Sequence, residues 1–226
     1  MTADFLWHER ARPTRGPKPA LTLEQITDAA ITVADAEGLA AVSMQRVAAD
    51  LGFTKMSLYR YVPGKAELVA AMLERAVGEP PPPTGHQWRA ALTDWATRLL
   101  ARYLRHPWAL AATAGARPIG PNEMGWLERA LGVLPEGLTG AERMDAVATL
   151  AGQVRMIAGQ AGQQESELGA VIGLILREHA GRFPAVAAAI ADIGARGGGD
   201  QAFAFGLERL LDGVEALIDS RPGQAG

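Results

Sequence analysis

The stretch SMQRVAADLGFTKMSLYRYVPGK, residues 43–65, restricts the fold of this chain more than any other part of its sequence. Ser43 and Thr54 each stand directly before a short run with helical spacing, at the place where hydroxyl side chains cap helices. Gly52 supplies a turn between the two runs. Two short helices joined by such a turn form a helix-turn-helix, whose second helix can enter the major groove of DNA.

The side chains of this stretch divide into an apolar set and a polar set. Small or apolar side chains are needed where the two helices cross, and we expect the following to be buried: Val47, Ala48, Leu51, Phe53 and Leu58. The side chains that we expect to point outward from the second helix are Lys55, Met56, Ser57, Tyr59 and Arg60. Cations suit phosphates or guanine edges, hydroxyls suit phosphates, and an apolar surface suits the methyl group of thymine.

The formal net charge of −3 does not by itself indicate a nucleic-acid partner. Residues 1–78 contain nine basic and nine acidic side chains, whereas the rest of the chain contains 13 basic and 16 acidic ones. In the first part, basic residues gather over 10–18 and 55–65, whereas an intervening segment carries Glu24, Asp28, Asp35 and Glu37. The placement of the charges, rather than their sum, is therefore compatible with DNA binding.

The chain as a whole predicts an all-α fold, because apolar residues recur at helical spacing and no stretch alternates convincingly with a period of two. The expected helices span residues 22–38, 44–51, 55–61, 65–77, 88–106, 108–113, 123–134, 142–164, 167–180, 185–193 and 203–220. A proline run over 80–83 marks the boundary between two domains. We expect a flexible basic arm over 1–20, a three-helix helix-turn-helix DNA-binding domain over 21–78, a larger helical effector-binding and dimerisation domain over 86–220, and a tail over 221–226.

Residue types that are absent or scattered exclude several classes of site. The chain has no cysteine, which excludes disulfides, a thiolate nucleophile and cysteine-ligated metals. No two of its four histidines have the i, i+4 spacing of a helical metal site, and no nucleophile, base and orienting group come together. We therefore predict no enzyme, no metal and no cofactor. No apolar run approaches the roughly 18 residues of a membrane span, and the N-terminus lacks a signal pattern, so we expect a cytoplasmic protein without a membrane partner.

The segment LGFTKMSLYRYVPGKAEL, preceded by EGLAAVSMQRVA, resembles the helix-turn-helix of the TetR family of bacterial one-component repressors. The turn glycine, the Leu-Tyr pair and the downstream lysine coincide with the spacing of that family, and the resemblance covers residues 22–77. The final segment AFGLERLLDGVEALI is similar to the C-terminal domain of the tetracycline-repressor type.

The resemblance implies DNA contacts residue by residue. Tyr59 and Tyr61 would contact phosphates or base edges, although Tyr61 stands where the family often has histidine. Lys65 matches the phosphate-binding lysine of the family, and Ser43 and Thr54 would offer hydroxyls and helix N-termini to the DNA backbone. The positions that vary within the family and select the DNA sequence are Gln45, Lys55, Met56, Ser57 and Arg60.

Simpler interpretations of these residues stay open at this point. Tyr59 and Tyr61 can instead cap the small core of the domain. Lys65 can be an ordinary solvated lysine, although a cation at the start of a helix opposes the helix dipole. The basic arm over 10–18 can follow the minor groove or the phosphates, or it can serve only as a solubilising tail.

The second domain carries candidates for binding a small molecule. One face of the helix predicted over 142–164 mixes amides with a flexible thioether: Thr149, Gln153, Met156, Gln160 and Gln164. Organic ligands bind in apolar pockets with a few fixed polar groups, so this face is a candidate ligand site, or else an ordinary solvated face. Further candidates, although residues of these types more often belong to the core, are Trp95, His106, Trp108, Trp126, His179 and Phe183. The expected effector is organic and largely apolar.

Two apolar stripes near the end of the chain predict a dimer. One stripe consists of Phe203, Leu207, Leu210, Leu211, Val214, Leu217 and Ile218. The other consists of Leu168, Val171, Ile172, Ile175 and Leu176. The resemblance implies that such helices pair across a two-fold axis, so that two recognition helices read a near-palindrome. The alternative is that the stripes only close the core of one chain.

Together these features predict a homodimeric transcriptional regulator, a repressor that a small-molecule effector releases from a double-stranded DNA operator. Alternatives that the sequence leaves open are an activator, a helical small-molecule-binding protein without DNA binding, and an all-helical enzyme. The identity of the effector, the operator sequence and the regulated genes do not follow from the sequence.

Overall fold

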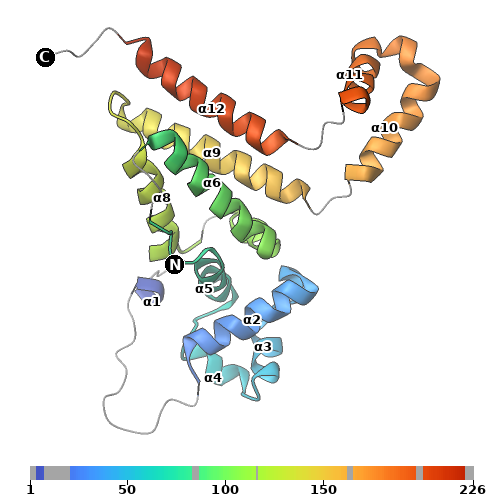
Figure 1. The fold of residues 1–226 in the computed structure, drawn as a ribbon. Helices are drawn as coiled ribbons and strands as arrows, with labels where there is room; N and C mark the ends of the chain where they lie inside the picture. Colours follow the sequence, from blue (N-terminus) through green and yellow to red (C-terminus); the bar gives the residue numbers. More distant parts are fainter. Residues whose placement is uncertain are drawn as a thin grey trace, which may run out of the picture. The chain divides into compact units, whose positions relative to one another are not determined.

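The all-α prediction is confirmed: all regular structure in the part of the chain that the computed structural model describes is helical (Figure 1). The described residues are 4–7, 21–82, 87–115, 117–161, 165–196 and 201–221. The chain divides into two compact units, residues 1–147 and 148–226, and each unit is described by itself. Outside the described residues lie the basic arm over 10–18, Gln164 and the tail beyond Arg221. The predicted domain bounds stay a prediction.

Every helix expected from the sequence is present, with ends that differ by a few residues. The helices of the first unit are α1 (Asp4–Trp7), α2 (Leu23–Glu37), η1 (Leu39–Ala41), α3 (Met44–Asp50), α4 (Lys55–Tyr59), α5 (Lys65–Val77), α6 (Trp88–Arg105), α7 (Trp108–Ala112) and α8 (Pro121–Val133). Helix α9 (Gly140–Gln160) spans the division, and after it come α10 (Glu165–His179), η2 (Ala180–Arg182), α11 (Pro184–Arg196) and α12 (Ala202–Asp219). The sequence pattern predicts neither α1 nor the 3-10 turns, because such short elements show no periodicity. None of the described helices is both long and apolar enough to cross a membrane.

Capping side chains determine where the first helices begin. At the start of α2, Thr22 Oγ1 accepts the N–H of Gln25 at 3.1 Å, and Gln25 Oε1 accepts the N–H of Thr22 at 2.9 Å. At the start of α3, Ser43 Oγ accepts the N–H of Arg46 at 3.1 Å. Thr54 caps α4 in the same way. The hydroxyl residues thus act as the caps that the sequence predicts.

Helix α5 is central to the first unit, because it contacts α2, α6, α7 and α8. The largest fully buried side chains of this unit are Ile26, Val42, Val47, Leu58, Val62, Leu68, Met72 and Leu73. Burying one such side chain contributes about 1.5–3 kcal/mol. Helix α5 thus packs against α2, which in turn contacts α3, and it also packs against the three helices that follow it.

In the second unit, side chains of α9 and α12 form the buried core. Leu150, Val154 and Ile157 of α9 are buried, and so are Leu207, Leu211 and Val214 of α12. Part of the apolar stripe predicted on α12 therefore packs within its own chain, whereas Leu217 is 39% exposed. On α10, Val171 and Ile175 of the other predicted stripe are 50% and 45% exposed.

Candidate nucleic-acid interface

The turn between α3 and α4 has the geometry of a helix-turn-helix. Gly52 has a φ of +73°, a left-handed conformation that glycine adopts without the strain of a Cβ. The N–H of Gly52 bonds to the carbonyl of Ala49 at 3.1 Å, and that of Phe53 to the carbonyl of Ala48 at 2.9 Å. These bonds satisfy the last carbonyls of α3 and turn the chain toward Thr54, where α4 begins.

The apolar residues predicted beneath the turn hold the two helices together. Val47 and Leu58 are completely buried, and Ala48 is 2% exposed. Leu51 and Phe53 are half-buried at the edge of this core. Leu58 fixes which face of α4 points inward, so the residues around it in the helix point outward.

The outward face of α4 carries the polar side chains that the sequence predicts there. Lys55, Met56, Tyr59 and Arg60 are exposed, and Met56 reaches 72%. Lys55 Nζ lies 5.5 Å from the centre of the Tyr59 ring, a cation–π arrangement that places a charge and a phenol side by side. Ser57 is half-buried, and its hydroxyl lies 3.0 Å from that of Thr54.

The remaining predicted DNA contacts lie before and after α4. Gln45 is exposed in the first turn of α3, next to the cap at Ser43. Tyr61 is half-buried, and its N–H bonds to the carbonyl of Leu58 at 2.8 Å. Lys65 is exposed as the first residue of α5, whose cap residue, a glycine, makes no side-chain hydrogen bond. The Lys65 ammonium and the free backbone N–H groups at the start of α5 therefore both favour a bound anion.

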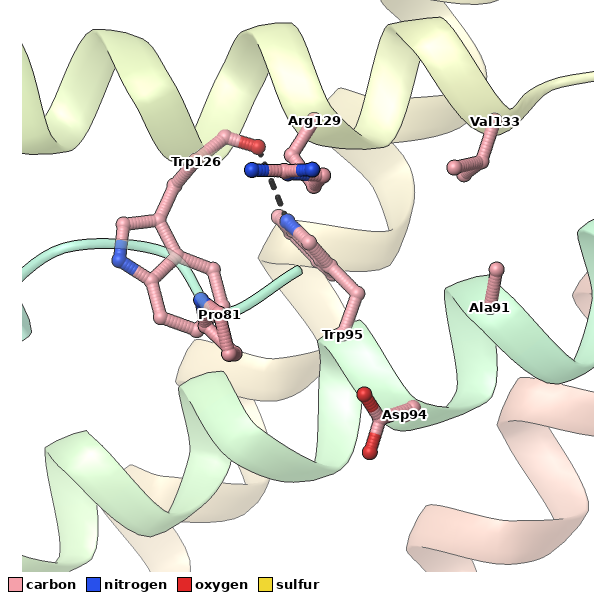
Figure 2. A pocket seen from close by; sticks show the side chains of 7 residues that line it. All are labelled: Pro81, Ala91, Asp94, Trp95, Trp126, Arg129 and Val133. Carbon is pink, nitrogen blue, oxygen red and sulfur yellow. Dashed lines mark hydrogen bonds between the residues drawn. The ribbon is translucent and has the colours of Figure 1, made fainter. Parts of the chain in front are cut away.

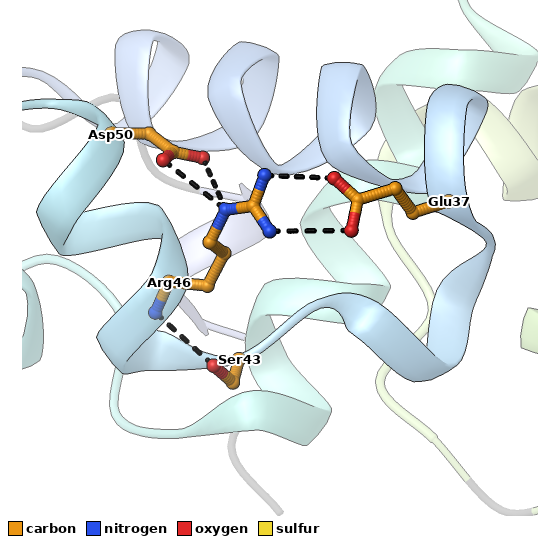
Figure 3. A network of polar contacts seen from close by, with 4 residues as sticks. All are labelled: Glu37, Ser43, Arg46 and Asp50. Atoms are coloured by element: carbon orange, nitrogen blue, oxygen red, sulfur yellow. Dashed lines mark hydrogen bonds and ion pairs between the residues drawn. The ribbon is translucent and has the colours of Figure 1, made fainter.

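A charged network around Arg46 was not predicted from the sequence (Figure 3). Arg46 donates to both carboxylate oxygens of Glu37, from Nη2 at 2.8 Å and from Nη1 at 3.2 Å. Its Nε lies 3.0 and 3.2 Å from the two carboxylate oxygens of Asp50. The hydrogen bonds to Glu37, and then those to Asp50, raise the pKa of Arg46 above its ordinary value. The i, i+4 spacing of Arg46 and Asp50 is a signal that sequence reading could have used.

Helix α5 is joined to α8 by a buried carboxylate that the sequence also does not single out. Glu74 of α5 is 8% exposed, and its carboxylate accepts the N–H of Asn122 and, at 3.2 Å, that of Glu123. Asn122 Nδ2 in turn donates to the carbonyl of Glu74 at 3.0 Å. Burial raises the pKa of Glu74 above its ordinary value, and the two backbone N–H groups oppose that rise. Glu74 thus satisfies the free N–H groups at the start of α8.

Two of the tryptophans proposed for ligand binding bond to backbone carbonyls beside this junction (Figure 2). Trp95 Nε1 donates to the carbonyl of Trp126 at 2.9 Å, and Trp126 Nε1 donates to the carbonyl of Gly78 at 2.9 Å. Their rings meet edge to face, with centres 5.9 Å apart. The pocket that they line together with Pro81, Ala91, Asp94, Arg129 and Val133 has room for about one water molecule.

Two further ligand candidates contact α2. Trp108 Nε1 donates to Asp35 Oδ1 at 2.6 Å, and His106 Nδ1 lies 2.8 Å from the same oxygen. Trp108 is 6% exposed, and its ring centre lies 5.8 Å from that of His106. The structure therefore brings these aromatic side chains to the end of α2 that leads toward the helix-turn-helix.

The other ligand candidates lie in the second unit. Thr149, Met156 and Gln160 of α9 are exposed, and so is His179 at the end of α10. Gln153 is half-buried, and its Nε2 donates to the carbonyls of Phe203 at 3.2 Å and Ala202 at 3.4 Å. Among the described residues, no three His, Asp or Glu side chains are grouped so that they could hold a metal ion.

Comparisons with known proteins point to one family. Residues 26–72 match the family described as bacterial regulatory proteins, tetR family. Residues 79–218 match the tetracyclin repressor-like C-terminal domain. Among curated proteins, the HTH-type transcriptional repressor DrrR1 of Streptomyces coeruleorubidus is 42% identical over 240 aligned positions, which cover 99% of this chain and 88% of that protein.

Solved structures of one regulator have the same fold. Apo ActR from Streptomyces coelicolor is 25% identical, with a TM-score of 0.77 over 90% of this chain and 99% of that one. ActR in complex with actinorhodin is 26% identical, with a TM-score of 0.72 over 91% of this chain and 99% of that one. The similarity therefore extends over both the helix-turn-helix and the helices that follow it.

Proposed function

Because this chain belongs to the TetR family of bacterial transcriptional regulators, we propose that it is a repressor that leaves a near-palindromic operator when a small organic molecule binds. The observation that carries the proposal is the outward face of α4, where Lys55, Met56, Tyr59 and Arg60 are exposed on a helix anchored by Leu58. A rigid helix with exposed cations, a phenol and a thioether is suited to the major groove.

The DNA contacts divide into a positioning set and a reading set. Ser43, Thr54 and Lys65 contact phosphates, because each stands at the start of a helix where backbone N–H groups favour an anion. The tyrosines of the α4 region, Tyr59 and Tyr61, contact phosphates or base edges. The side chains that read the sequence are Gln45, Lys55, Met56, Ser57 and Arg60.

We propose that two copies pair through α10 and α12 and so present two recognition helices to one operator. The exposed apolar side chains Val171 and Ile175, one turn apart on α10, and Leu217 of α12 support this, because large exposed apolar side chains favour an interface. The domains that we assign to these roles are residues 21–78 for DNA and 86–220 for effector binding and dimerisation.

The contacts of α5 provide the route by which an effector would release the DNA. Lys65 begins α5 and Glu74 near its other end caps α8, so a shift of α8 moves the helix that carries Lys65 and packs against α2. Asp35 of α2 binds Trp108 and His106 at a second point of the same unit. A coupling of about 1–3 kcal/mol between the two sites is the usual scale for such regulation.

For the effector we propose an organic and largely apolar molecule. The relative ActR has been solved with actinorhodin, which supports a small organic ligand for this chain as well. The candidate residues are Trp95, His106, Trp108, Trp126, Thr149, Gln153, Met156, Gln160, Gln164 and His179. We propose that the protein acts in the cytoplasm and binds its effector without chemical conversion.

Fluorescence anisotropy on the DNA that flanks the gene of this protein tests the proposal. A scrambled duplex of the same length and composition is the control, and both are titrated over a series of salt concentrations. We expect tighter binding to the flanking DNA, with an affinity that falls linearly with log salt for both duplexes. Equal binding to the two duplexes would contradict specific recognition at that site. An organic ligand that binds tightly and leaves operator affinity unchanged would contradict the coupling.

A further inference from the structure

The charged network of Glu37, Arg46 and Asp50 lies directly beside the first proposed phosphate contact (Figure 3). The N–H of Arg46 is the group that Ser43 Oγ caps, at 3.1 Å, so the guanidinium and the cap belong to the same helical turn. Gln45, one of the proposed reading residues, is the neighbour of Arg46 in the chain. A guanidinium binds phosphate with the same fork that binds carboxylate, so an arginine in this turn is a candidate for a further phosphate contact.

In this structure the guanidinium of Arg46 is hydrogen-bonded to two carboxylates. Its two terminal nitrogens face the two oxygens of Glu37, at 2.8 and 3.2 Å, and its Nε faces those of Asp50. One guanidinium between two carboxylates leaves a net charge of −1 at this corner of α2 and α3. DNA that approaches the corner therefore meets a repulsive charge, and not the cation that the sequence contains.

We infer that Glu37 and Asp50 withhold Arg46 from DNA phosphates and thereby limit how strongly the domain binds DNA of arbitrary sequence. The inference rests on the proposed DNA-binding function and adds specificity-determining residues to it. Phosphate contacts contribute to binding on every sequence, whereas base contacts contribute only on the operator. A cation kept away from phosphates consequently increases the ratio of specific to non-specific affinity.

The exposure of the network means that its effect can be measured. The side chains of Arg46, Glu37 and Asp50 are 44%, 46% and 40% exposed, so solvent reaches all three. A single exposed ion pair contributes little stabilising free energy, whereas a bidentate arginine within a network contributes more. Removing both carboxylates should therefore release the guanidinium to a phosphate without exposing any buried charge.

The test compares Glu37→Gln/Asp50→Asn with wild type on a scrambled duplex over a salt series. We expect the double variant to bind scrambled DNA about tenfold more tightly, with the slope of log affinity against log salt steeper by about 0.9, the value for one added phosphate contact. Affinity for the flanking DNA should rise less, so that the specificity ratio falls. The matched control is Asp94→Asn/Glu128→Gln, which makes the same change of net charge on α6 and α8 and should leave the slope unchanged.

Arg46→Gln provides a second, independent measurement. If Arg46 makes no phosphate contact in wild type, this variant keeps the wild-type salt slope; a slope reduced by about 0.9 would overturn the inference. An unchanged slope in the double variant, or an equal change in the control, would also overturn it. Circular dichroism of each variant checks folding, and the single variant Glu37→Gln replaces the double one if the latter does not fold. Wild type that binds neither duplex would refute the proposed function itself.

Discussion

The carboxylate of Glu74, near the end of α5, accepts the backbone N–H of Asn122 at the start of α8. The two residues are 48 positions apart in the chain, and a second bond returns from Asn122 Nδ2 to the carbonyl of Glu74 at 3.0 Å. A side chain from one helix thus supplies the cap of another. The contact joins α5, which packs against α2, to a helix of the region that we assign to effector binding.

Replacing Glu74 by alanine should lower the free energy of unfolding by about 1–2 kcal/mol, because two N–H groups at the start of α8 lose their acceptor. Urea denaturation of the whole chain measures the loss. Glu79→Ala is the matched control, since Glu79 is exposed five residues later. We expect it to change stability by less than about 0.5 kcal/mol. Equal stability of the two variants would mean that the cap contributes nothing.

The raised pKa of Glu74 predicts a pH dependence of stability with a definite sign. The folded chain holds this proton more tightly than the unfolded chain, whose glutamate titrates near its ordinary value of 4.5. The stability that protonation of Glu74 contributes is therefore complete below that value and is lost as the pH rises through the folded pKa.

Glu74→Gln removes this titration and keeps the shape of the side chain. The unfolding free energy of wild type, minus that of the variant, should fall as the pH is raised from about 5 and should become constant once Glu74 is ionised. Denaturation at a series of pH values measures the difference. A difference that increases with pH would show that the carboxylate is stabilised, not strained, by its site.

Gly120 and Gly132 should respond oppositely to alanine. A Cβ on Gly120 would lie 2.5 Å from the carboxyl carbon of Glu74, whereas a Cβ on Gly132 meets nothing within 4 Å. Gly120→Ala should therefore destabilise the fold by about 1–3 kcal/mol. Gly132→Ala, within α8, should stabilise it by up to about 1 kcal/mol through helix propensity.

A double-mutant cycle of Gly120→Ala with Glu74→Ala tests where the destabilisation arises. In the Glu74→Ala background the side chain that blocks the new methyl group is absent, so Gly120→Ala should cost less than it does in wild type. Thermal or urea denaturation of the four proteins gives the interaction energy. Additive effects would place the destabilisation elsewhere than at Glu74.

Lys65→Ala should weaken binding to the flanking and scrambled DNA by the same factor and should lower the salt slope by about 0.9, as expected for one lost phosphate contact. Arg98→Ala is the control, because Arg98 is an exposed cation of α6, paired with Asp94 at 2.7 Å and outside the proposed DNA-binding domain. Anisotropy titrations measure both slopes. A loss of affinity for the flanking DNA alone would assign Lys65 to base reading.

Local signals in the sequence were sufficient for the helices and for the helix-turn-helix. Thr22, Ser43 and Thr54 cap helices whose N–H groups lie three residues away, and Gly52 forms the expected turn. Such bonds form between near neighbours, so the order of residues alone indicates them. The outward face of α4 followed in the same way, because helical periodicity around Leu58 determines which side chains are exposed.

The contacts that join distant segments could not be predicted from the sequence. In the sequence, Glu74 is simply one acidic residue of an amphipathic helix. Only the packing of α5 against α8 buries its carboxylate, where it accepts the N–H groups of Asn122 and Glu123. Likewise, the sequence shows Arg46 only as a cation of the DNA-binding region. The structure shows that Glu37 of α2 lies beside it and accepts its hydrogen bonds. What the sequence by itself determined was the helices and their exposed faces, because these depend on neighbours a few residues apart. Which charges are paired and which helices are linked was decided by the tertiary structure, because those interactions depend on the packing of residues far apart in the chain.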